Sequence, residues 1–137
     1  FTREGERFEK IRKLLKVTDL VMLDIKHIDD EQHKILTGQT NRNILDMARY
    51  LDEIGKPMWI RHVLVPERSD KDEYLTRLDA FIQSLHNVQK VEVLPYHTLG
   101  AYKWKELGYE YPLEGIDPPT QERIKNANLL LHTGARV

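Results

Sequence analysis

The stretch from Thr18 to His27 constrains the fold most, because a short apolar run there ends in charged residues. The run is too short for an ordinary helix and is bounded by polar residues, which favours a mostly buried β-strand. Side chains alternate along a strand, so Met22, Asp24 and Lys26 share one face while the opposite face is apolar. Opposite charges at the C-terminal end of a strand lie where parallel α/β folds place their ligands. A structural ion pair at the strand exit is the alternative.

Composition excludes several classes of function. The chain has 137 residues, enough for one domain, and carries 21 Lys and Arg against 22 Asp and Glu without a basic block. We therefore expect no nucleic-acid partner. The apolar runs are too short to cross a membrane and no signal peptide is evident, so we expect a soluble, cytoplasmic protein with no membrane partner. The start at Phe1, in charged sequence, suggests a piece of a longer protein.

The periodicity of apolar residues predicts alternating helices and strands. The predicted strands are 20–26, 58–65 and 91–96, and the predicted helices are 6–16, 29–36, 41–54, 69–85, 101–107 and 118–134. Asp29 with Asp30, and Asn41, are the predicted N-caps of the second and third helices. A capping box of Asp70 and Glu73 is predicted to begin the fourth.

This alternation predicts right-handed crossovers and a parallel α/β sheet. All three strands then end at one edge, where Asp24, Lys26 and His97 would gather. A parallel sheet normally has both faces covered, and three strands are few. The face that carries Met22, Asp24 and Arg61 therefore needs a partner, which predicts a half barrel of three βα units with an exposed inner face.

Arg61 is the most informative single residue, because a guanidinium inside an apolar strand is costly to bury without an acid or an anionic ligand. Asp24 on the neighbouring strand is the expected acid, and a purely structural pair is the alternative. His97 follows the last strand, where it can donate a hydrogen bond to a ligand or lie on the surface.

Other motifs carry less weight. The cluster His27, Asp29, Asp30, Glu31 and His33 resembles a divalent-metal site, but the acids are expected to act as helix caps. Glycine-rich phosphate loops are absent. With no cysteine, the chain has no thiolate metal site and no cysteine nucleophile.

Four motifs in order carry a family resemblance: 19–27 (DLVMLDIKH), 36–38 (LTG), 59–66 (WIRHVLVP) and 94–97 (LPYH). Together they resemble the activases of glycyl-radical enzymes, within the radical S-adenosylmethionine superfamily. The continuation 99–104 (LGAYKW) is most similar to the members that act on pyruvate formate-lyase. The resemblance extends over essentially the whole chain.

The resemblance implies a partial (β/α)6 barrel resembling a TIM barrel, with residues 1–137 as its C-terminal half. Its cofactors would be S-adenosylmethionine and a 4Fe-4S cluster, its partners pyruvate formate-lyase and an electron donor such as flavodoxin. The activity would be reductive cleavage of S-adenosylmethionine and formation of a glycyl radical on the partner. The cluster's three cysteines would lie in the other half, and this chain has none, so alone it should be inactive.

Position by position, the resemblance implies that Asp24, Lys26, Arg61 and His97 bind the cofactor. It also places Met22 and Asp24 beside a monovalent-cation site. A cluster-free α/β ligand-binding or interaction module is the alternative function. A metal-dependent hydrolase fits poorly, because a second ligand group on another strand is missing.

Overall fold

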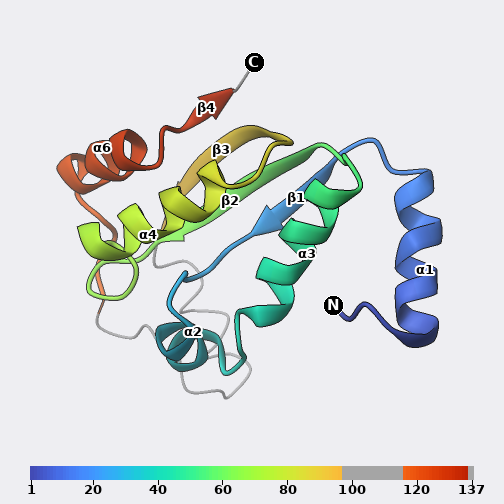
Figure 1. Ribbon diagram of the computed structural model, residues 1–137. Helices are drawn as coiled ribbons and strands as arrows, with labels where there is room; N and C mark the ends of the chain where they lie inside the picture. The colour runs from blue at the N-terminus through green and yellow to red at the C-terminus, as the bar shows by residue number, and fades with distance from the viewer. Residues whose placement is uncertain (97–115, 136–137) are drawn as a thin grey trace, which may run out of the picture.

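The computed structural model describes residues 1–96 and 116–135 (Figure 1). The elements in chain order are α1 (Gly5–Lys16), β1 (Val21–Asp24), α2 (Asp30–Thr37), α3 (Arg42–Glu53), β2 (Met58–Leu64), α4 (Asp72–Gln83), β3 (Val88–Pro95), α6 (Gln121–Leu130) and β4 (Gly134–Ala135). The helix predicted at 101–107 and the site residue His97 lie outside the described residues.

The sheet has four strands, and the three that were predicted are parallel, as expected. The order is β1-β2-β3-β4, with β1 parallel to β2 and β2 parallel to β3, and within the described residues the sheet does not close on itself. The antiparallel strand β4 was not predicted, since the last helix was expected to run to Gly134 but ends at Leu130. Gly134 has φ of 108°, a conformation that favours glycine, and a two-residue strand is too short to leave a periodic pattern.

One face of the sheet is covered by helices α3, α4 and α6, of which α3 and α4 lie in front of the strands in Figure 1. The side chains that alternate toward this face are buried, and β2 shows the alternation along its whole length. The core joins strand and helix residues, including Leu23, Ile60, Val91, Leu51, Leu75, Leu78, Ile82 and Ala127. Burying one such large apolar side chain stabilises the fold by roughly 1.5–3 kcal/mol.

The opposite face of the sheet is open around β1. Met22 on β1 is 53% exposed, although it lies beside Trp59 of β2 in the register. On the same face, Trp59 and Arg61 are only half-buried, so this part of the sheet also reaches solvent. The predicted exposure of this inner face around Met22 is therefore confirmed.

The local signals for helix ends were partly correct. Asp29 caps α2, since its carboxylate accepts a hydrogen bond from the Gln32 N–H, and Gly38 ends this helix with φ of 78°. Asn41 precedes α3, but its side chain makes no cap. The predicted capping box at Asp70 is wrong, because α4 begins at Asp72 after Lys71.

The residues before α4 instead organise the loop that follows β2. The Ser69 hydroxyl accepts from the Val65 N–H and donates to the Val63 carbonyl, while the Asp70 carboxylate accepts from the Glu67 N–H. Side chains of this type often hydrogen-bond to nearby backbone in turns, in competition with helix capping. These contacts place Ser69 and Asp70 in the loop and start the helix later.

No helix among residues 1–96 and 116–135 has the length and apolarity that crossing a membrane requires.

Two methionines on neighbouring strands test which face is the core. Met58 is fully buried and Met22 is 53% exposed. We expect Met58→Ala to lower the free energy of unfolding by about 2–5 kcal/mol, because it leaves a cavity. The matched variant Met22→Ala should cost much less. Urea unfolding of both variants measures the difference, and equal losses would contradict the assignment of faces.

Candidate functional site

The ion pair between Asp24 and Arg61 is the centre of the candidate site. The two residues are register partners on β1 and β2. Arg61 donates from Nε to Oδ1 of Asp24 at 2.7 Å and from Nη2 to Oδ2 at 3.1 Å, which is a two-point arrangement. The hydrogen bonds to Asp24 and the negative charge of the Asp24 carboxylate raise the pKa of Arg61. The predicted ion pair is confirmed.

This ion pair is not buried, which corrects the expectation that the strand encloses the guanidinium in apolar surroundings. The side chains of Arg61 and Asp24 are 32% and 37% exposed. The reason is alternation: Arg61 lies between Ile60 and His62, which face the core, so its own side chain points to the open face. Solvent screening makes such a pair a weak source of stability.

The ion pair retains capacity for a ligand. A carboxylate has about four lone-pair sites and a guanidinium five N–H donors, and the pair uses two of each. Asp24 can therefore accept hydrogen bonds from hydroxyl groups while Arg61 holds its plane. The arrangement suits a ligand that carries neighbouring hydroxyls.

Lys26 follows Asp24 on the same side of the chain, just beyond the end of β1, and its side chain is half-buried. The backbone around it is tied to β2, because the Ile25 N–H donates to the Arg61 carbonyl at 2.9 Å. An ammonium at this position can donate to an anionic group of a ligand. Acid and ammonium thus lie at the carboxyl end of β1, and the guanidinium lies beside the acid in the middle of β2.

His27 anchors the loop that follows. Its ring is fully buried, Nδ1 accepts from the Asp29 N–H at 3.0 Å, and Nε2 lies 2.9 Å from the Arg68 carbonyl. These partners select the tautomer with the proton on Nε2. The ring joins the loop after β1 to the loop after β2, and burial lowers the pKa of His27.

Asn41 and Asp30 complete this support. The Asn41 amide donates to the carbonyls of His27 and Ile28, at 3.2 and 2.8 Å. Hydrogen bonds from the Thr40 hydroxyl and the Asn41 N–H lower the pKa of Asp30 to about 2. The Asn41 side chain therefore holds the strand exit, which explains why it does not cap α3.

His62 is the supporting residue that sequence reasoning missed. Its ring is 2% exposed, and Nδ1 lies 2.7 Å from the carbonyl of Ile25, next to Lys26. Burial lowers the pKa of His62, since a charged ring is disfavoured away from water. The signal was available, because alternation places His62 on the core face together with Ile60 and Leu64.

The acidic and histidine cluster at 27–33 is engaged in hydrogen bonds and an ion pair. In the part of the chain that the structure describes, no group of three or more His, Cys, Asp or Glu side chains is arranged to hold a metal ion. The rings of His27 and His33 are taken up by backbone contacts, and Asp29 caps a helix and pairs with Arg77 at 3.0 Å. These residues are structural.

Of the predicted site residues, the structure brings Asp24 and Arg61 into contact and places Lys26 at the same strand end. Met22 lies two residues before Asp24 on β1, so both side chains are on the open face. His97 is outside the described residues, so its position relative to the others stays a prediction.

The buried histidines predict a pH dependence of stability. Burial lowers the folded pKa values of His27 and His62 below the ordinary value of 6.5, so the folded state disfavours protonation of both rings. The unfolded chain then binds more protons as the pH falls below about 6.5, and stability must fall with it. Urea unfolding between pH 7.5 and 5.5 measures this slope.

His62→Gln should reduce the slope even if it lowers stability at pH 7.5. Met58→Ala provides the control, because it lowers stability from the core without removing a titrating group. It should leave the slope largely unchanged. An unaltered slope in His62→Gln would contradict the role given to the buried ring.

Comparisons with known proteins identify the family of this chain. Residues 2–78, more than half of the chain, match the model of the Radical SAM superfamily. The chain is 56% identical over 133 residues to a pyruvate formate-lyase-activating enzyme of Streptococcus mutans, which covers 97% of this chain and 51% of the relative. It is 53% identical over 135 residues to the enzyme of the same name in Listeria monocytogenes, covering 98% and 54%. The chain spans about half the length of these relatives.

Solved structures show the same fold. A domain of pyruvate-formate lyase-activating enzyme from Bacteroides vulgatus superposes with a TM-score of 0.74 at 20% identity, over 90% of this chain and 68% of that one. A radical SAM methyltransferase from Sphaerobacter thermophilus gives a TM-score of 0.62 at 18% identity, over 90% of this chain and 34% of that one. With the matched family model, these findings establish that the chain belongs to the radical SAM superfamily.

Proposed function

We propose that this chain is the C-terminal half of an activating enzyme that cleaves S-adenosylmethionine reductively and generates a glycyl radical on pyruvate formate-lyase. Asp24, Lys26, Arg61 and His97 would bind the cofactor. The Asp24–Arg61 pair on the open sheet face carries the proposal, together with relatives of that name at more than 50% identity.

The site residues fit S-adenosylmethionine by chemical type. The cofactor offers a carboxylate, two ribose hydroxyls and a positively charged sulfonium. Lys26 supplies an ammonium for the carboxylate, and Asp24 supplies acceptor oxygens for hydroxyls. The open face around Met22 provides space that the chain's described helices do not fill.

The chain does not fit a 4Fe-4S cluster. Such clusters are held by cysteine thiolates, and none of the 137 residues is cysteine. The cluster ligands would therefore lie in the other half of the parent protein. This chain alone is expected to be inactive.

In the complete parent enzyme, the cofactor with its cluster supplies the radical chemistry. The residues of this chain bind and orient. Arg61 fixes the plane of the Asp24 carboxylate, so that its free lone pairs point in a set direction. Lys26, held by the ladder between Ile25 and Arg61, places one anionic end of the cofactor.

Further assignments rest on the same proposal. Met22 and Asp24 would lie beside a monovalent cation, whose other ligands would come from the other half. An electron donor such as flavodoxin would supply the reducing electron, and the protein would act in the cytoplasm. These assignments follow from the resemblance of the motifs.

A binding experiment separates a ligand role from a structural one. In the anaerobically purified parent enzyme, which should be brown and contain iron, Lys26→Ala and His97→Ala should weaken S-adenosylmethionine binding about tenfold or more. Their melting temperatures should change little. Isothermal titration and thermal melting on the same preparations measure both quantities.

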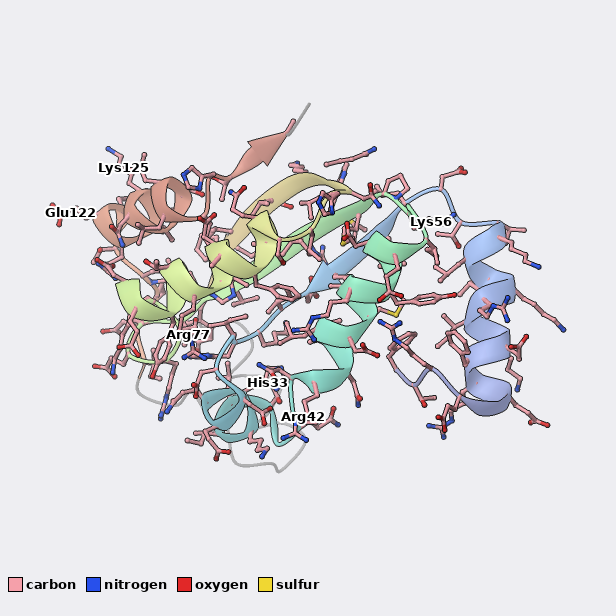
Figure 2. All side chains as sticks on the ribbon, in the orientation of Figure 1. His33, Arg42, Lys56, Arg77, Glu122 and Lys125 are labelled. Carbon is pink, nitrogen blue, oxygen red and sulfur yellow. The ribbon has the colours of Figure 1, made fainter. Side chains whose placement is uncertain are left out.

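The exposed Lys125 of α6 gives a matched control, since Lys125→Ala removes the same group far from the strand ends (Figure 2). A large loss of melting temperature with unchanged affinity would make Lys26 and His97 structural. A colourless parent without iron would favour the cluster-free module instead.

The planar fork of Arg61 gives a second test. Arg61→Lys keeps the charge but loses the two-point contact with Asp24, so it should reduce glycyl-radical formation on the partner while the fold survives. Electron paramagnetic resonance of the partner's radical is the measurement. Arg42→Lys at the exposed start of α3 is the control (Figure 2). A wild-type radical yield from Arg61→Lys would contradict the orienting role.

A further inference from the structure

Glu92 is the third charged residue of a row that crosses the sheet. The register pairs Asp24 of β1 with Arg61 of β2, and Arg61 with Glu92 of β3. Paired residues of adjacent parallel strands point to the same face. Glu92 therefore lies on the open face, on the other side of Arg61 from Asp24, and is half-buried.

The charges in this row do not cancel. Asp24 takes both contacts of the Arg61 fork, so one acid and one base compensate each other. Glu92 adds a second acid, and its charge is felt at Arg61, whose pKa is raised by Asp24 first and also by Glu92. The row of three residues has a formal net charge of −1.

The nearest base on the strand of Glu92 is directed elsewhere. The Lys90 ammonium lies over the ring of Trp59, 4.9 Å from its centroid, two register positions before the Arg61–Glu92 pair toward the amino end of the strands. Lys26 lies at the opposite end, beyond β1. The middle of the open face is thus an anionic layer between two cations.

A sulfonium has no hydrogen-bond donor, so a protein recognises its charge by electrostatic attraction alone. The sulfur of S-adenosylmethionine is bonded between the part that carries the carboxylate and the ribose. If Lys26 takes the carboxylate and Asp24 the hydroxyls, the sulfur is held beside the row that contains Arg61. Without Glu92 that row would be neutral.

We propose that Glu92 is a specificity-determining residue that makes this row anionic and thereby favours the cationic sulfonium over a neutral thioether of the same shape. The role deepens the proposed function and rests on it. Glu92 acts through space and need not touch the cofactor, because unit charges several ångströms apart in a half-exposed site still interact measurably.

The test compares two ligands that differ in the charge on sulfur, S-adenosylmethionine and S-adenosylhomocysteine. Isothermal titration of the anaerobic parent enzyme gives both affinities for wild type, Glu92→Gln and Glu92→Lys. We expect the preference for the sulfonium to fall about threefold to tenfold in Glu92→Gln and further in Glu92→Lys. The affinity for the thioether should stay nearly constant or rise.

Glu122→Gln is the matched control, because Glu122 is exposed on α6 and extends away from the sheet (Figure 2). It changes the net charge equally and should leave the preference unchanged. If Glu92→Gln lowers the affinity for both ligands equally, Glu92 has a structural role. An unchanged preference for the sulfonium over the thioether would also overturn the proposed role. A wild-type enzyme that binds neither ligand would overturn the proposed function itself.

Discussion

The pairing of β1 with β2 is the constraint on which the site depends. The register places Asp24 opposite Arg61, and the strand period of two puts both on the open face while Leu23 and Ile60 enter the core. A slip by one residue would move the charges into the core and the apolar residues into water. The buried core therefore fixes the geometry of the ion pair, although the pair itself adds little stability.

Neighbouring residues of strand β2 serve the candidate site from opposite faces of the sheet. Arg61 points to the open face, and its neighbour His62 points to the core, where its Nδ1 contacts the carbonyl of Ile25. The loop after β1 is held further by His27 and Asn41, whose contacts are with backbone atoms. Lys26 thus lies on a short segment that is fixed from the core side and accessible from the other.

Sequence periodicity was sufficient for the three parallel strands, for the described helices apart from some of their ends, and for the Asp24–Arg61 contact. Alternation determines which side chains share a face, and a buried apolar pattern determines which face is the core. Side-chain contacts with distant backbone were not predictable in this way. Asn41 and Ser69 are residue types that commonly cap helices, but Asn41 donates to the Ile28 carbonyl in the loop after β1 and Ser69 to the Val63 carbonyl of β2. Strand β4 was also not predictable, because a strand of two residues is too short to show an alternation of apolar and polar side chains.

The exposed face explains why the chain carries charges that its own fold does not need. Met22, Arg61 and Glu92 line a surface of the sheet that in parallel α/β proteins is usually covered. If apolar side chains covered this face, the charged row of Asp24, Arg61 and Glu92 would lose its contact with water, which costs free energy. A second half that left water or a polar ligand over the row would avoid that cost. The charges are therefore consistent with a barrel whose interior is a binding cavity at the carboxyl ends of the strands rather than a packed core.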